Sequence, residues 1–397
     1  MDPAPGQPDA SPSLAPAPLA AAWRRTRPPR RVVHLDSAAA GRSSWAVLDA
    51  SAAHARREAE VGGYVAAAAA APVLERARDD VRALLGWPAG EGSVAFVHGA
   101  GDALAQLLLA WPGGAPVTAA HAPGEYGPNV ALLRHLGVRP LPVPGPHRLD
   151  PEAFARALGA GLRPDLVHVT WVGSHVGTVQ PAAQVAAACA AAGVPVVVDA
   201  AQAFGHVDTA LDALPAEADV VVYGTSRKWL AGPRGVGFVA ARGPLAARLG
   251  PLERTEAHVA GWLGFAAALA EHRDLGPAAV RAGLADVGRA VRHRLADALR
   301  GSWQVLEDPA EPSATVTLRP AGGPGPDSGA DDGGVDLAAL RARLLAQEGV
   351  LTTFLGTERA PGEMRAPALR VSGHLDTTAA DVDRLADALR RAVAGPL

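Results

Sequence analysis

The sequence predicts an α/β fold in which helices cover a mostly parallel sheet, followed by a smaller α+β domain. Between residues 94 and 240, short Val-rich runs alternate with helical segments at the spacing of βα units. Apolar runs without polar alternation are typical of strands that are buried on both faces. The chain has 397 residues, which exceeds the roughly 250–300 residues at which single cores stop growing, so we expect two domains.

The first half of the chain is expected to form an arm and a large domain. Residues 1–30 are rich in Pro, Ala and Arg and lack hydrophobic periodicity, which predicts a disordered arm. The large domain should then span 31–245. It should contain a helix at 46–57, a second helix that ends near 85, and strands at 94–97, 116–119, 166–170, 194–198 and 219–223, with a further strand at 235–240.

After residue 243 the pattern changes, and we expect a small C-terminal domain over 246–397. Helical segments fill roughly 244–300 and precede a strand at 315–318. Residues 320–334 are rich in Gly, Pro and Asp, which predicts an exposed loop. A helix at 337–347, strands near 350 and 369, and a last helix from about 379 complete the domain.

Composition and charge argue against several classes of partner. The net charge of −3 gives no electrostatic reason to expect nucleic acid or anionic membrane, and no apolar run approaches the roughly 20 residues of a membrane span. The histidines show no metal-ligand spacing, so no metal site is expected. The lone Cys189 cannot form an intramolecular disulfide, which fits a reducing cytoplasm.

Lys228 is the single lysine of the chain, and every other residue among the 37 Lys and Arg is an arginine. A desolvated lysine can lose its proton and condense with an aldehyde, whereas an arginine stays protonated. Lys228 lies just after the predicted strand 219–223 and before the glycine-rich segment 232–237, where open α/β sheets place their ligands. It is therefore a candidate catalytic amine; the alternative is a surface lysine without a role.

Pyridoxal phosphate (PLP) needs such a lysine, an acid at its pyridine nitrogen, donors for its phosphate and a group packed on its ring. Asp199 ends an apolar strand, where a pyridinium would keep its carboxylate ionised; the alternative is a helix cap. Gln202 could donate to the phenolic oxygen of the ring, or be an ordinary polar residue at a helix start. Tyr126 could stack on the ring, or pack in the core.

Two segments could bind the phosphate. Ala100 and Gly101 open a predicted helix whose free backbone N–H groups suit a dianion. Thr225 and Arg227, beside the lysine, could add a hydroxyl and a guanidinium, and Ser226 lies between them. The alternative for Arg227 is a solvated loop charge.

In this order, the segments resemble the class V aminotransferase branch of fold type I PLP enzymes, which includes cysteine desulfurases. The matching elements include Leu35-Asp-Ser-Ala-Ala39, Glu125-Tyr126, Gly177-Thr-Val-Gln-Pro181, Asp199-Ala-Ala-Gln202, Thr225-Ser-Arg-Lys228, Gly232-Pro-Arg-Gly235 and Leu369-Arg-Val-Ser372. The resemblance implies a PLP fold type I large domain with a seven-stranded-type sheet between helices. It also implies that Lys228 holds the cofactor, that Asp199 meets the pyridine nitrogen, and that a homodimer places active sites at the subunit interface.

Three positions depart from the desulfurase pattern. Tyr126 and Arg227 stand where the desulfurases have histidines, and Ser174 stands where an asparagine often faces the ring oxygen. The resemblance assigns Ser174 to the cofactor site.

The resemblance also suggests residues for an amino-acid substrate. Arg370, on a predicted strand, is suited to bind an α-carboxylate bidentately. Tyr64, Arg57 and His175 are candidates for recognising the rest of the substrate, although a core histidine is an alternative for His175.

Residues 58–65, 123–129 and 226–235 look more narrowly like carbon–sulfur lyases of ergothioneine biosynthesis. This implies β-elimination from hercynylcysteine sulfoxide to give ergothioneine, pyruvate and ammonia. Cys189 lies in a predicted amphipathic helix, so a desulfurase that uses its own persulfide is not expected, and a lyase needs no thiol. The alternatives are another class V reaction, such as transamination, epimerisation or desulfuration, and a non-catalytic binding protein with the same fold.

Overall fold

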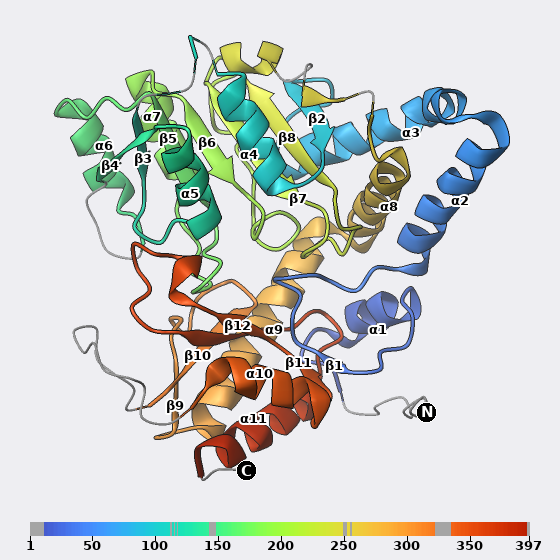
Figure 1. Cartoon of the computed structure of the whole chain (residues 1–397), viewed down its shortest axis with the longest axis vertical. Helices are drawn as coiled ribbons and strands as arrows, with labels where there is room; N and C mark the ends of the chain where they lie inside the picture. The colour runs from blue at the N-terminus through green and yellow to red at the C-terminus, as the bar shows by residue number, and fades with distance from the viewer. Residues whose placement is uncertain are drawn as a thin grey trace.

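A seven-stranded sheet lies at the centre of the larger part of the molecule (Figure 1). The computed structural model describes residues 12–111, 113–114, 116, 118–142, 148–248, 252–254, 256–321 and 335–394. The sheet has the spatial order β2-β8-β7-β6-β5-β3-β4, and only β8 runs antiparallel to its neighbours. The predicted mostly parallel α/β sheet is confirmed. Its strands are β2 (Ser93–Val97), β3 (Thr118–His121), β4 (Arg139–Pro142), β5 (Leu166–Thr170), β6 (Val196–Asp199), β7 (Val220–Thr225) and β8 (Gly237–Arg242).

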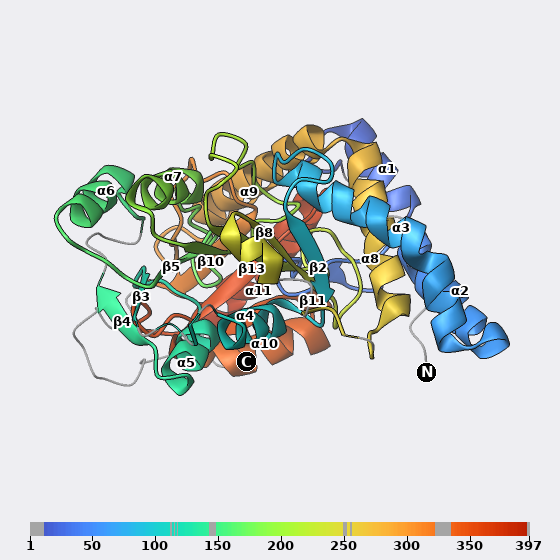
Figure 2. The same cartoon turned by 90° about the horizontal axis from the view of Figure 1, so that it is seen from above.

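Helices cover both faces of this sheet, as the view from above shows (Figure 2). Successive strand side chains point to opposite faces. In β6, Val197 therefore packs with residues of α4 (Ala100–Leu109) and α5 (Gly127–His135), whereas Val196 and Val198 face the other side. That side is covered by α3 (Gly63–Leu84), α6 (Pro151–Gly159), α7 (Ala182–Ala192) and α8 (Val259–Leu275). Burial on both faces explains why the central strands are continuous apolar runs.

Two long helices extend from one side of the sheet (Figure 1). Helix α2 (Trp45–Val61) is capped by Ser44, whose hydroxyl accepts the Val47 N–H, and is followed by Gly62. Gly62 has φ +90°, a conformation that favours glycine, and the chain turns there directly into α3. Among the described helices, none combines the length and hydrophobicity that a bilayer crossing requires.

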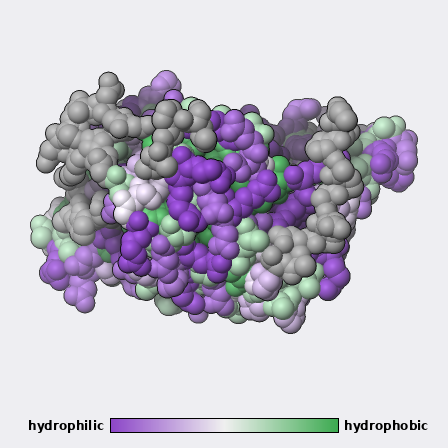
Figure 3. Space-filling model, turned by 90° about the horizontal axis from the view of Figure 1, so that it is seen from below, coloured by the Kyte–Doolittle hydropathy of each residue, from purple (hydrophilic) through white to green (hydrophobic). Residues whose placement is uncertain are grey.

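The smaller domain is built on a four-stranded antiparallel sheet of order β12-β13-β10-β9. A short parallel pair, β1 (Val33–His34) and β11 (Val350–Leu351), lies beside it. Residues 322–334 of the predicted loop lie outside the described residues. The small domain lies at the bottom of Figure 1, and the surface seen from below is largely hydrophilic where it is coloured (Figure 3). The other elements are β9 (Trp303–Val305), β10 (Thr315–Pro320), β12 (Thr353–Leu355), β13 (Ala368–Ser372), α9 (Pro277–Ala298), α10 (Leu337–Ala346), α11 (Ala379–Ala394) and the 3₁₀ turns η1 (Pro244–Arg248) and η3 (Thr357–Arg359).

The predicted disordered arm is wrong for residues 12–30, while residues 1–11 lie outside the described residues. Helix α1 (Ala17–Arg25) buries Trp23, which stacks on His374 with ring centroids 3.9 Å apart. Arg27 lies over the other side of the indole and pairs with Glu271. Trp23 and Ala20 are buried against the small domain and Arg27 is paired with Glu271, and the Pro/Ala-rich composition could not reveal these contacts.

The domain boundaries also differ from those expected. Helix α8 follows residue 245, but its Trp262 and Phe265 belong to the core of the large sheet. At the other end, Leu35 and Trp23 pack in the core of the small domain. The chain therefore begins in the small domain, builds the large one and returns after α8.

Candidate active site

A cavity of about 350 Å³ lies at the carboxyl ends of β5, β6 and β7. These strands end in Thr170, Asp199 and Thr225, and all three residues line the cavity. Parallel strands end at one edge of the sheet, so residues distant in sequence meet there. The wall contains nine of the ten residues predicted for the cofactor: Ala100, Gly101, Tyr126, Ser174, Asp199, Gln202, Thr225, Arg227 and Lys228.

Lys228 follows β7 in the cavity wall and forms no ion pair with any described residue. Burial lowers the pKa of its amine to about 7, and the positive charges of Arg227, Arg370 and Arg359 act in the same direction. The carboxylate of Asp199 opposes that shift. An amine that loses its proton near neutral pH is suited to attack an aldehyde.

Asp199 is a buried carboxylate that lacks a cationic partner among the described side chains. Its Oδ1 accepts the backbone N–H of Ala201 at 2.8 Å, and its Oδ2 accepts the Asn129 amide at 2.9 Å. Burying a charge is costly unless it is paired. A protonated pyridine nitrogen in the cavity would supply the missing partner, so this residue fits PLP.

Gln202 and Tyr126 lie on the same cavity wall. The Gln202 amide donates to the Ala38 carbonyl at 2.9 Å, and its oxygen accepts the Trp229 indole N–H at 3.1 Å. These two bonds fix the side chain and leave one amide hydrogen for a ligand. Tyr126 precedes α5, and its ring centroid lies 5.6 Å from the guanidinium carbon of Arg359.

The expected phosphate end of the cavity is formed by α4 and the lysine loop. Helix α4 begins at Ala100, after Gly99 with φ +148°, and its first N–H groups have no partner within the helix. Arg227 binds the Ala39 carbonyl, and the Thr225 hydroxyl donates to the Val236 carbonyl at 3.2 Å. A helix N-terminus, a hydroxyl and a guanidinium together suit a phosphate dianion.

Three of the other predicted residues do not line this cavity. The Ser226 hydroxyl is turned away and donates to the Pro233 carbonyl. Arg57 and the 72%-exposed Tyr64 lie on α2 and α3 and are absent from its wall. Their place in a single subunit therefore gives them no contact with the cofactor cavity.

His175 and Arg370 lie next to the cavity without lining it. His175 Nε2 is 3.1 Å from Glu363 Oε1, and both residues line a separate small pocket that also includes Thr170. Arg370 is buried, donates to the Ser174 carbonyl at 2.8 Å, and lies 3.9 Å from Asp36. Burial lowers the pKa of Arg370 to about 10, so it remains a cation near neutral pH.

Sequence reasoning missed a group of buried polar residues behind Asp199: Glu125, Asn129, His168 and Tyr223. Their signal was present, because His168 and Tyr223 interrupt strands that are otherwise apolar, and Asn129 is the only asparagine of the chain. Buried polar side chains in such strands need hydrogen-bond partners. The partners come from α5 and the loop before it, which a reading of the strands alone could not supply.

Comparisons with known proteins agree with this geometry. The aminotransferase class-V family matches residues 33–261. A probable hercynylcysteine sulfoxide lyase of Mycobacterium tuberculosis (strain CDC 1551 / Oshkosh) is 48% identical over 95% of this chain and 94% of its own length.

Solved structures share the fold. The apo cysteine desulfurase of Thermococcus onnurineus NA1 gives a TM-score of 0.73 at 17% identity, covering 94% of this chain and 98% of its own. A cystine C–S lyase in complex with its product, cysteine persulfide, gives 0.72 at 16% identity, covering 92% and 98%. The chain therefore belongs to the aminotransferase class V family, with a PLP fold type I architecture, and is a PLP-dependent carbon–sulfur lyase.

Proposed function

We propose that this enzyme cleaves the C–S bond of hercynylcysteine sulfoxide by β-elimination. The products are pyruvate, ammonia and the sulfenate of the thiol-imidazole, which an external thiol would reduce to ergothioneine. The observation that carries this proposal is the cavity in which Lys228 and Asp199 line one wall, in a chain 48% identical to a probable lyase of that name.

PLP, when bound, supplies an electron sink for the charge left at the substrate Cα. Lys228 would hold the cofactor and would accept the Cα proton, and its lowered pKa keeps the amine neutral and able to take that proton near neutral pH. Asp199 would keep the pyridine nitrogen protonated, and Gln202 would donate to the phenolic oxygen. The Cβ–S bond then breaks with its electron pair on sulfur, and water hydrolyses the released aminoacrylate to pyruvate and ammonia.

The charges around the cavity support a substrate with more than one carboxylate. The positive charges of Arg227, Arg359 and Arg370 lower the pKa of Lys228. The carboxylate of Asp36 raises the pKa of both Arg227 and Arg370. Hercynylcysteine sulfoxide carries the α-carboxylate of its cysteine half and a second carboxylate on its hercynine half. We assign the α-carboxylate to Arg370 and the second one to Arg359, beside Tyr126.

The single cysteine of the chain argues against a desulfurase that forms a persulfide on its own thiol. Cys189 is fully buried in α7, and burial raises the pKa of its thiol to about 12. A buried, protonated thiol is a poor nucleophile. The chain has no second cysteine.

The test is to incubate the PLP-loaded enzyme with hercynylcysteine sulfoxide and to measure pyruvate and the imidazole product. We expect one pyruvate for each C–S bond cleaved. Transamination or epimerisation would consume substrate without stoichiometric pyruvate, which would contradict the proposal. Lys228→Ala is the control, because it should lose both turnover and the visible absorbance of lysine-bound cofactor; a yellow, active variant would overturn the role of this lysine.

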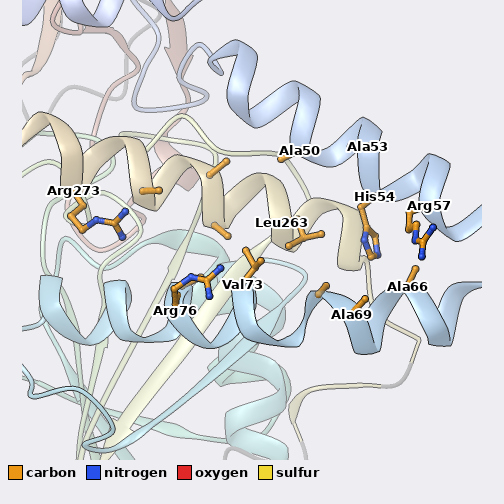
Figure 4. Close-up of a pocket in the computed structure, with 15 residues that line it drawn as sticks. Ala50, Ala53, His54, Arg57, Ala66, Ala69, Val73, Arg76, Leu263 and Arg273 are labelled. Carbon is orange, nitrogen blue, oxygen red and sulfur yellow. The ribbon is translucent and has the colours of Figure 1, made fainter.

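We also propose that the enzyme works in the cytoplasm as a homodimer, with α2 and α3 at the interface. A groove of about 560 Å³ lies between α2, α3 and α8 (Figure 4). Alanines with Val73 and Leu263 form its apolar lining, and the remaining lining residues are His54, Arg57, Arg76 and Arg273. Exposed apolar residues flank it on the same helices: Trp45, Leu48, Tyr64 and Val65. A second copy would cover these side chains and bring Tyr64 and Arg57 within reach of a neighbouring site.

Sedimentation analysis tests the dimer. We expect a mass of two chains for the wild type and one chain for Leu48→Glu, because a buried unpaired charge disfavours the interface. Leu109→Glu, at the exposed end of α4, is the matched control. A monomeric wild type would refute the dimer while leaving the cofactor site intact.

A further inference from the structure

Four buried side chains and Asp199 form a closed ring of hydrogen bonds. The Asn129 amide donates one hydrogen to Asp199 at 2.9 Å and the other to Glu125 at 3.0 Å. The second oxygen of Glu125 lies 2.9 Å from His168 Nδ1, and His168 Nε2 lies 2.9 Å from the Tyr223 hydroxyl. Asp199 and Asn129 both lie close enough to the Tyr223 hydroxyl to act on its pKa as hydrogen-bonding groups, and the contact with Asp199 closes the ring.

The fold explains why these residues meet. His168 and Tyr223 lie on β5 and β7, the two strands on either side of β6, which ends in Asp199. Asn129 lies in the first turn of α5, which covers that face of the sheet, and Glu125 lies in the loop just before it. Asp199 and Asn129 line the cavity, whereas the other three members lie behind them and are almost completely buried.

Only one arrangement of protons satisfies the whole ring when both carboxylates are ionised. A carboxylate accepts and cannot donate, so the hydroxyl of Tyr223 must donate to Asp199 and therefore accept from His168 Nε2. Glu125 must likewise accept from His168 Nδ1. Both imidazole nitrogens then carry hydrogen, and His168 is a cation.

The electrostatics of the pair agree with this arrangement. Burial alone would lower the pKa of His168, but the charge and hydrogen bond of Glu125 raise it above its usual value. Burial would raise the pKa of Glu125, yet His168 and the hydrogen bonds from Thr170 and Asn129 lower it to about 2. The two charges cancel, so Asp199 is left as the net negative charge at this end of the cavity.

We propose that the Glu125–His168 ion pair is a positioning device that, through Tyr223 and Asn129, keeps Asp199 ionised and directed at the pyridine nitrogen of PLP. If His168 lost its charge, Tyr223 would turn its hydroxyl toward the imidazole and Asp199 would lose a donor. A hydrogen bond to a carboxylate favours its charged form, so losing this donor would make the charged carboxylate a less favourable partner for the pyridinium. The pyridine proton would then move toward Asp199.

The experiment measures the ¹⁵N chemical shift of PLP labelled at the pyridine nitrogen and bound to the enzyme without substrate. We expect a pyridinium signal in the wild type and a shift toward neutral pyridine in His168→Asn. Tyr223→Phe removes the donor to Asp199 but leaves the ion pair, so its signal should shift by less. Losing one hydrogen bond to a charged group should also weaken PLP retention about tenfold in His168→Asn.

The matched control is His272→Gln, a buried histidine of α8 outside the ring. Burial lowers the pKa of His272 to about 4, so this substitution removes no charge. Wild-type ¹⁵N signals in both His168→Asn and Tyr223→Phe would overturn the proposal. If His168→Asn does not fold, Tyr223→Phe alone tests the proposal, because it removes only one hydroxyl group. The measurement uses no substrate, so the proposed substrate can be wrong while this device stands.

Discussion

The lowered pKa of the Lys228 amine can be measured directly, because the chain contains no other lysine. The perturbation is the pH of a labelling reaction with a small acylating reagent on the cofactor-free protein. Peptide mass spectrometry separates labelling at Lys228 from labelling at an α-amino terminus. The rate of labelling follows the fraction of neutral amine.

The size of the effect follows from a pKa of about 7. Above that pH the amine is mostly neutral, and below it mostly charged, so labelling should rise between pH 6 and 8. At pH 8 about 90% of the amine would be neutral, compared with about 0.4% for a lysine near its ordinary pKa of about 10.4. The predicted excess of reactive amine is therefore a few hundredfold.

Two variants test the causes of the shift. Arg359→Gln removes a cation that lowers the pKa of Lys228, so its labelling midpoint should move up. Asp199→Asn removes an anion that raises this pKa, so its midpoint should move down. A wild-type midpoint near 10 would refute the argument that burial neutralises the amine, and shifts in the reverse directions would refute the charge assignment.

Three further substitutions test the substrate and thiol assignments by steady-state kinetics and unfolding. Arg370→Lys keeps the charge but loses the fork that binds a carboxylate, so kcat/KM should fall about 100-fold with the fold intact; near-normal kinetics would contradict its role. Arg359→Gln should raise KM about fivefold for hercynylcysteine sulfoxide but little for an S-alkyl cysteine sulfoxide, which lacks the second carboxylate; equal effects would remove this assignment. Cys189→Ala should keep full turnover and lose about 1 kcal/mol of unfolding free energy, and an inactive, folded variant would point to a persulfide.

The sheet and most of the cofactor site could be predicted because both depend on local patterns. Val-rich runs predict the central strands. A polar residue at the carboxyl end of such a strand, such as Asp199, lies at the cavity edge regardless of how the helices pack. Ser226 was misplaced because neighbours in a loop point in different directions. A motif places its residues near a site, but it does not tell which side chains enter it.

What could not be predicted depends on contacts between distant segments. The order of the arm depends on Trp23 meeting His374, and the ring behind Asp199 depends on α5 lying against β5. Arg57 and Tyr64 were placed by resemblance, and within one chain no contact brings them to the cavity. Such pairings follow from the tertiary arrangement, which composition and periodicity do not encode.

The two ends of the cavity have opposite polarity, and this couples substrate binding to the basicity of Lys228. Arg227, Arg359 and Arg370 lower the pKa of the lysine in the free enzyme, when it must be neutral to hold the cofactor. A carboxylate bound to Arg359 or Arg370 would offset that charge and raise the pKa of Lys228, making the amine a stronger base when the Cα proton is removed. Saturating succinate should therefore move the Lys228 labelling midpoint of the cofactor-free protein upward, compared with chloride at the same ionic strength. An unchanged or lower midpoint would show that carboxylate binding and the lysine are not coupled through these charges.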